Sequence, residues 1–204
     1  MHRTHKLRAG IALLLSLLLA PAAAQQTDAG VWSFDPSVLA AGGDLLLRAP
    51  DREIDGLFQA VHAVAQSPNE VQALCGLFDP QADRSLAGLN AVASRLGPDS
   101  RTRFANAVAN VLVAAMQSSP QPHDVAAARQ SLKAAGVTAA ILHDGFLAGL
   151  NADGNDAATR DARCQSLRWL LDAMQTRPQP ERAAMTRLLL DEGLTRMGTT
   201  TIQP

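Results

Sequence analysis

The chain has 204 residues, of which 18 are basic and 19 are acidic, and 47% of its residues are hydrophobic. Because basic and acidic residues are nearly equal in number, the chain has no excess of positive charge that would attract DNA, RNA or anionic lipid. The composition therefore argues against a nucleic-acid-binding protein. Aromatic residues make up only 3% and Tyr is absent, which disfavours sites that stack bases or hold ligands through rings with polar tips.

The N-terminal 24 residues have the three parts of a bacterial export signal. A basic start, an apolar run and a stretch of small residues follow one another: Arg3, Lys6 and Arg8; Ile11 to Ala20; Ala22, Ala23 and Ala24. The run of about ten apolar residues is too short for a bilayer, which needs about 20. We expect cleavage after Ala24 and a mature chain that begins at Gln25, in the bacterial periplasm or outside the cell. The alternative is an uncleaved N-terminal anchor.

The expected mature chain is long enough for a single domain with a sizeable core. It keeps all 19 acidic residues and, once three basic residues leave with the leader, 15 basic ones, so its formal charge is −4. We expect residues 25–35 to be extended, residues 36–197 to form one helical domain and residues 198–204 to be a disordered tail.

Apolar residues recur at helical spacing over most of the mature chain, which predicts an all-α fold, a compact bundle of about seven to nine helices. The first helix, with Asp35 as N-cap, is expected to be weak because Gly42 and Gly43 interrupt it. A stronger amphipathic helix is predicted over residues 51–66, with His62 beside its apolar stripe.

Ser67 and Glu70 have the spacing of a capping box and predict a new helix that begins at once and ends near Phe78. Another helix is predicted up to Leu96. Asp99 or Ser100 should then cap the longest helix, which we expect to be the central element of the bundle.

The second half of the chain predicts four more helices. One follows Asp124 and should end at Gly136. The next should carry an apolar stripe of Ile141, Leu142, Phe146, Leu147 and Leu150. After a turn at residues 151–156, a helix capped by Asp156 follows, and a final helix begins near Glu181.

Cys75 and Cys164 are the two cysteines of the chain. An even count in a chain addressed to an oxidising compartment predicts a disulfide, here between an early and a late helix. The alternatives are a metal pair, which lacks the usual close cysteine or histidine spacing, and two buried free thiols.

His143, Asp144 and Gly145 form the one short motif that points to chemistry. This motif resembles the HDxG element of secreted phospholipases A2, in which the histidine acts through a water molecule and the aspartate holds calcium. The resemblance covers only these residues, and the glycine-rich calcium loop and the tyrosine of that family have no counterpart here. The alternative is an exposed histidine and aspartate beside the apolar stripe of a helix.

Other polar groups have structural explanations. The turn at 151–156 (NADGND) does not match an EF-hand loop, because Gly149 and Arg160 would fall at ligand positions. Glu53 favours a helix dipole and Glu70 belongs to the capping box. Helical spacing predicts three ion pairs on the surface: Asp156 with Arg160, Arg168 with Asp172, and Glu192 with Arg196.

These observations favour an exported helical binding or interaction module, whose partner is another protein or a small ligand of the cell envelope. We expect no cofactor, no metal and no nucleic acid. The alternative is a small secreted hydrolase acting on lipid or cell-wall glycan, with His143 and Asp144 as its candidate catalytic residues.

Overall fold

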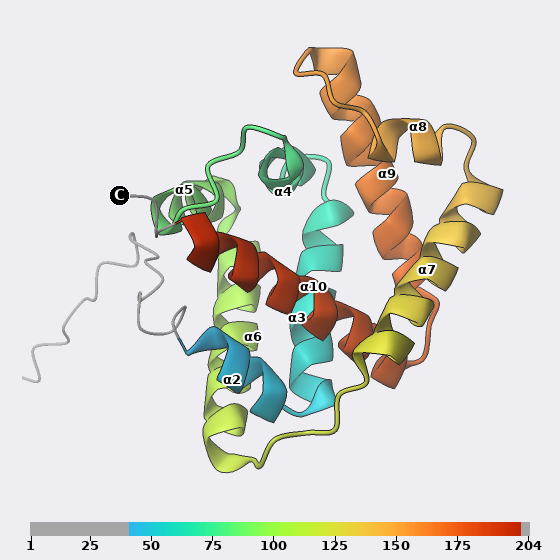
Figure 1. Ribbon diagram of the computed structural model, residues 1–204. Coiled ribbons are helices and arrows are strands. Elements are labelled where there is room, and N and C mark those ends of the chain that lie inside the picture. Colours follow the sequence, from blue (N-terminus) through green and yellow to red (C-terminus); the bar gives the residue numbers. More distant parts are fainter. Residues whose placement is uncertain (1–40, 201–204) are drawn as a thin grey trace, which may run out of the picture. The chain divides into compact units, whose positions relative to one another are not determined.

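The structure is a computed structural model that describes residues 41–200, and this part of the chain is entirely helical, as predicted (Figure 1). Nine α-helices and one short 3-10 helix follow one another: α2 (Gly42–Arg48), α3 (Asp51–Ala65), α4 (Val71–Cys75), η1 (Gly76–Phe78), α5 (Leu86–Arg95), α6 (Pro98–Gln117), α7 (Val125–Leu142), α8 (Phe146–Leu150), α9 (Ala157–Gln175) and α10 (Gln179–Thr200).

Several predictions for the two ends of the chain lie outside the described residues. They are the leader with its cleavage point, the extended segment 25–35, the cap at Asp35 and the end of the tail, residues 201–204. Within the described part, α10 continues to Thr200. The glycines Gly42 and Gly43 are the first two residues of α2, and the residues of the predicted first helix before position 41 lie outside the described part.

Helix α3 is the central element, because it packs against α4, α6, α9 and α10. The sequence placed the helix now called α6 at the centre, but α6 packs mainly against α3 and α2. The amphipathic pattern of α3 explains its place: Ile54, Phe58 and Val64 are almost fully buried. Small residues at the contacts, such as Ala60 of α3 and Ala183 of α10, are fully buried and let these helices approach closely.

Two arginines of α10 join the C-terminal helix to the first part of the bundle. Arg187 is buried and donates hydrogen bonds to the carbonyls of Leu46 and Ala49 at 2.8 and 2.7 Å and to Asp51 at 2.9 Å. These carbonyls lie at and just after the end of α2, where helical backbone partners are missing. Arg182 holds Asp55 of α3 through two hydrogen bonds of 2.8 and 3.0 Å.

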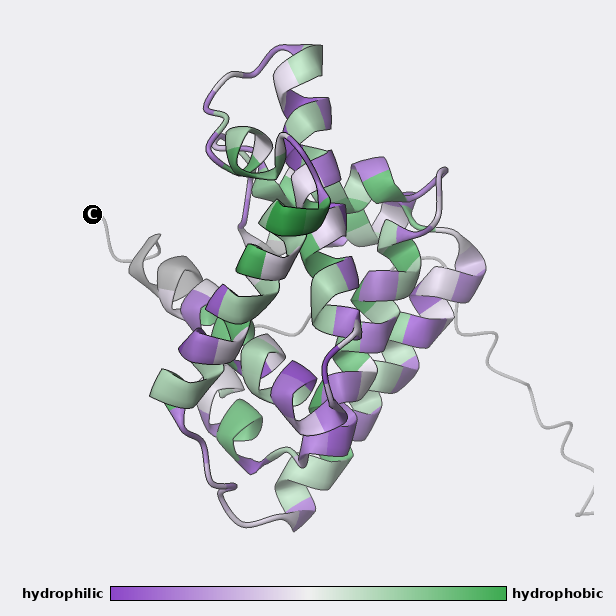
Figure 2. Cartoon of the chain, turned by 90° about the vertical axis from the view of Figure 1, so that its right-hand side faces the viewer, coloured by the Kyte–Doolittle hydropathy of each residue, from purple (hydrophilic) through white to green (hydrophobic). Residues whose placement is uncertain are grey.

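Helix α7 runs through Gly136, where the sequence predicted its end, and stops at Leu142. The break follows at Gly145, whose φ of 86° lies in the left-handed region that glycine adopts most easily. The change of direction overturns the predicted apolar stripe: Phe146 is 2% exposed, but Ile141 and Leu142 are 78% and 66% exposed. Figure 2 views the molecule from the side of α7 and α8, and hydrophobic segments are visible on these helices.

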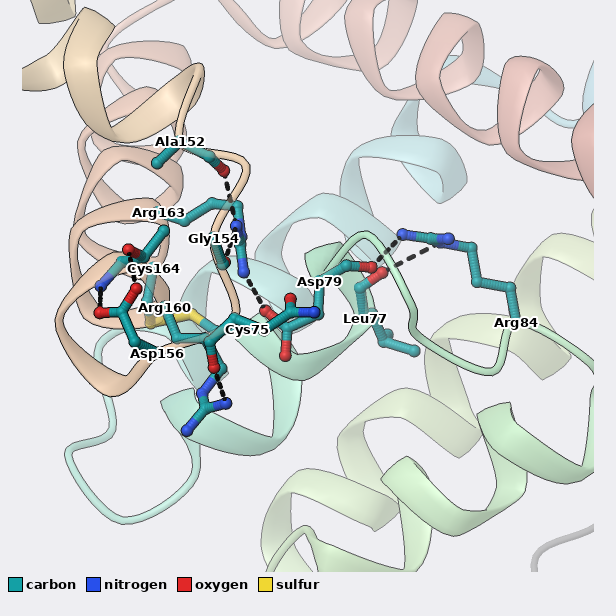
Figure 3. Close-up of polar contacts among 12 residues, drawn as sticks. Cys75, Leu77, Asp79, Arg84, Ala152, Gly154, Asp156, Arg160, Arg163 and Cys164 are labelled. Carbon is teal, nitrogen blue, oxygen red and sulfur yellow. Dashed lines mark hydrogen bonds and ion pairs between the residues drawn. A yellow bond between two sulfur atoms is a disulfide. The ribbon is translucent and has the colours of Figure 1, made fainter.

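The predicted disulfide is confirmed: Cys75 at the end of α4 is bonded to Cys164 in α9, 89 residues later (Figure 3). Both cysteines are buried together with Val71. Next to the disulfide, Arg163 donates to Asp79 at 2.6 Å and to the carbonyl of Ala152 at 2.6 Å, and thereby ties the turn after η1 to the turn before α9.

Glu70, predicted to form a capping box with Ser67, has its main hydrogen-bond partners on another helix. Glu70 occupies the N-cap position of α4 without capping it through its side chain. Its carboxylate instead accepts the backbone N–H of Gly97 at 2.5 Å and the hydroxyl of Ser100 at 2.8 Å, so it caps the distant helix α6. The predicted caps of α6, Asp99 and Ser100, are replaced by Gly97 at the N-cap position.

Candidate functional site

An apolar pocket of about 180 Å³ lies between α3, α4, η1, α5 and α6. Ten residues line it, all but one of them apolar: Val61, Val64, Leu74, Leu77, Leu89, Val92, Ala93, Leu96, Arg101 and Phe104. Its inner residues, Val64, Leu74 and Leu96, are buried, whereas the lining residues of α5 are half-buried. The pocket therefore reaches from the core to solvent beside α5.

Helical geometry explains why two walls of the pocket are apolar. Val61 and Val64 are three positions apart on α3 and so share a face. On α5, the residues Leu89, Val92 and Ala93 repeat at the same spacing. Helical periodicity shows which residues face inward, but it does not show how well the facing helices fill the space between them, so the sequence did not predict this cavity.

The chain that leads into α5 is fixed by local hydrogen bonds. The side chain of Arg84 donates to the carbonyls of Leu77 and Asp79 at 3.1 and 2.7 Å. Ser85 then caps α5 by accepting the N–H of Gly88 at 3.2 Å. Helix α5 itself packs chiefly against α4 and η1, so the wall that it contributes has few tertiary contacts with the rest of the bundle.

Arg101 is the only charged residue that lines the pocket. It lies in the second turn of α6 and is half-buried. No residue of the described part, 41–200, forms a hydrogen bond or an ion pair with its guanidinium. The sequence did not indicate that Arg101 lines a pocket, because an arginine near the start of a helix is usually exposed to solvent.

The acidic residue Glu70, at the N-cap of α4, already has partners at the start of α6. Hydrogen bonds from the Gly97 N–H and the Ser100 hydroxyl lower the pKa of Glu70, and Ser67 and Arg103 lower it further. Glu70 is thus held as a carboxylate that stabilises the start of α6. Its hydrogen bonds join two of the helices around the pocket.

A histidine–aspartate pair that the sequence did not predict lies between α3 and α9. His62 Nε2 is 2.9 Å from Asp172 Oδ1 of α9, and Gln66 donates to the same oxygen at 2.7 Å. The His62 ring is stacked on Phe58, with ring centroids 5.8 Å apart. The pair joins α3 to α9, and neither His62 nor Asp172 lines the pocket.

His143 and Asp144 lie in the turn between α7 and α8 rather than on a helix. The His143 ring is stacked on Trp169 of α9, with centroids 4.5 Å apart and planes 4° apart, and Asp144 is exposed. Neither residue lines the pocket. The structure therefore does not bring the predicted catalytic candidates to this cavity.

The turn at 151–156 acts as predicted: Asp156 caps α9 by accepting the N–H of Thr159 at 3.0 Å. Two of the predicted surface ion pairs are wrong. Arg160 donates to the carbonyl of Asn155, and Asp172 pairs with His62 rather than with Arg168. Helical spacing permits such pairs, but carbonyls and groups on other helices compete for the same side chains.

Glu192 forms its ion pair with Arg129 of α7, at 3.6 Å; the side chain of its predicted partner, Arg196, lies outside the described part. Between residues 41 and 200, no group of three histidine, cysteine, aspartate or glutamate side chains is arranged to hold a metal ion. No helix in the same range combines the length and the apolar character of a membrane span.

A second apolar feature is a set of exposed side chains on α7 and α8: Val137, Ile141, Leu142, Leu147 and Leu150. Three of them lie in the second half of α7, which ends at Leu142, and two lie in α8. Single exposed apolar residues are common, but these five are concentrated on two consecutive helices.

No protein-family model, curated protein or solved structure matches the chain. The geometry of the pocket and the chemistry of the residues that surround it are therefore the basis for a proposed function.

Proposed function

We propose that the protein is an exported binding protein that holds a small apolar ligand in the pocket between α3, α4, α5 and α6. The pocket itself carries the proposal: it has an apolar lining, a volume of about 180 Å³ and an opening beside α5. Cavities of roughly 150 Å³ lined by aliphatic and aromatic residues stay dry and bind molecules such as benzene. Filling this pocket would remove apolar surface from water, which is the main driving force for such binding.

The lining chemistry also favours binding over catalysis. Apart from Arg101, the pocket presents no titratable or nucleophilic side chain. A ligand with a chain of six to eight carbons could bury several methylene groups, each contributing roughly 0.8 kcal/mol before the entropy of association is subtracted. We therefore expect dissociation constants of about 0.1–1 mM for a simple eight-carbon alcohol.

The proposed location is the bacterial periplasm or the cell exterior. The leader-like sequence up to Ala24 supports export, and the disulfide of Cys75 and Cys164 is typical of proteins in oxidising compartments. The intact mass of the protein purified from its host tests this part. A mature chain that begins at Gln25 is expected, and a chain that keeps the apolar run would contradict export with cleavage.

Ligand binding is tested by titrating octan-1-ol into the ¹⁵N-labelled protein and following its amide resonances by NMR. Ala93→Phe fills the pocket from α5, because Ala93 lines it, whereas Ala91→Phe makes the same change at an exposed position of the same helix. We expect the wild type and Ala91→Phe to bind and Ala93→Phe to lose binding. Absence of binding to the wild type, or equal binding to both variants, would overturn the proposal.

The hydrolase alternative from the sequence rests on His143 and Asp144 and has its own test. His143→Ala removes the ring that is stacked on Trp169 and should cost about 0.5–1 kcal/mol of stability. Loss of a lipolytic or lytic activity by this variant, with the fold intact, would favour the hydrolase over the binding protein.

A further inference from the structure

The wall of the pocket is almost wholly apolar, but one of its ten lining residues, Arg101, ends in a charged group. Arg101 lines the cavity from α6, beside Phe104 one turn later, and the other lining residues are apolar. A guanidinium carries five N–H donors and stays charged at any physiological pH. Among the described residues, none supplies an acceptor for these donors.

The acidic residues near the start of α6 do not neutralise Arg101. Glu70 is hydrogen-bonded to Gly97 and Ser100, and Asp99 is exposed in the first turn of α6. The pocket thus combines an apolar interior with an unpaired cation among its lining residues. This combination is complementary to a molecule with an apolar chain and one anionic group.

We propose that the ligand is a free single-chain carboxylate of about six to ten carbons, with its chain in the pocket and its carboxylate paired with Arg101. This inference rests on the proposed binding function and specifies the ligand class of the same pocket. The planar guanidinium and a carboxylate form two parallel N–H···O hydrogen bonds, which neutral head groups cannot match. Arg101 is therefore the specificity-determining residue of the site.

The test compares two ligands with the same chain length, octanoate and octan-1-ol, by isothermal titration calorimetry at low salt. Because Arg101 is only half-buried, we expect octanoate to bind about fivefold more tightly than octan-1-ol. The variant Arg101→Met keeps an unbranched stem against the apolar wall but removes the charge. It should bind both ligands equally, and Arg101→Lys should restore part of the preference.

Arg103→Met is the matched control, because Arg103 is exposed and lies 200° around α6 from Arg101, away from the lining. This variant should keep the preference for octanoate. Added salt should weaken the binding of octanoate to the wild type and leave the binding of octan-1-ol unchanged.

The outcomes separate the two proposals. If octan-1-ol binds but octanoate has no advantage, or if the advantage survives in Arg101→Met, the carboxylate inference fails and the binding function stands. If neither ligand binds, both fail. Capture of the wild type but not of Arg101→Met by phosphatidylglycerol vesicles would assign the anionic group to a membrane lipid and overturn the free carboxylate.

Discussion

The disulfide should be the largest single contribution to the stability of this domain. Cys75 and Cys164 close a loop of 89 residues, for which the chain-entropy relation gives about 4.6 kcal/mol at 25 °C. Domains of this kind have roughly 5–15 kcal/mol of total stability, so the loss would be a large fraction of the whole.

The perturbation is the double variant Cys75→Ala with Cys164→Ala. Alanine suits both positions because the cysteines are 7% and 5% exposed and a serine hydroxyl there would be buried. We expect the free energy of unfolding, measured by urea denaturation and circular dichroism, to fall by about 4–5 kcal/mol and the melting temperature to fall by about 10–18 °C.

Reduction of the wild type should produce the same decrease, and a reducing agent should have no further effect on the double variant. The variant should also bind ligand more weakly, because Cys75 lies between Leu74 and Leu77, which line the pocket. A decrease of less than about 1.5 kcal/mol would show that the loop-closure argument is wrong for this fold.

Three further changes test the polar contacts. Arg187→Met leaves the carbonyls of Leu46 and Ala49 buried without their donors, so the free energy of unfolding measured in urea should fall by about 3 kcal/mol. The control Arg48→Met removes an exposed ion pair and should lower it by less than about 1 kcal/mol. Because the pKa of Glu70 is lowered, its ionised carboxylate stabilises the folded state fully above the ordinary pKa of 4.5, and this stabilisation is lost as the pH falls through the lowered pKa. Glu70→Gln should therefore lose less stability on acidification than the wild type. Equal losses would contradict this explanation. Asp156→Ala removes the cap of α9 and should cost about 1 kcal/mol in the same assay, and an equal effect of Asp153→Ala, three residues earlier in the same turn, would show that capping is not the cause.

The helical class, the disulfide, the start of α7 after Asp124 and the cap at Asp156 could be predicted from the sequence, because each depends on local spacing or on a rule about compartment. The capping box at Ser67 failed since the carboxylate of Glu70 is used by Gly97, 27 residues later in the chain. No local pattern shows such a tertiary partner.

The end of α7 was misplaced for a related reason. Glycine costs about 1 kcal/mol inside a helix, so the sequence predicts an end at Gly136. In the structure, the neighbouring Ala135 and the following Ala139 are fully buried against the rest of the core, and this packing keeps the helix intact. The true break needs the left-handed backbone that Gly145 provides.

The candidate site was the least predictable part. His143 and Asp144 have side chains that could act in catalysis, so the sequence favoured them as candidates. The pocket, however, is lined mainly by valines and leucines, which a sequence does not distinguish from ordinary core residues. A cavity depends on how side chains from four helices fill a volume, and sequence periodicity carries no information about that fit.

A crystal structure of the protein with octanoate tests the central claim most directly. The account predicts electron density for the chain between α3 and α5, in contact with Val64 and Leu96, and the carboxylate within hydrogen-bond distance of Arg101. Density for the ligand only against the exposed residues Ile141 and Leu142, with the pocket empty or filled by Phe104, would contradict it.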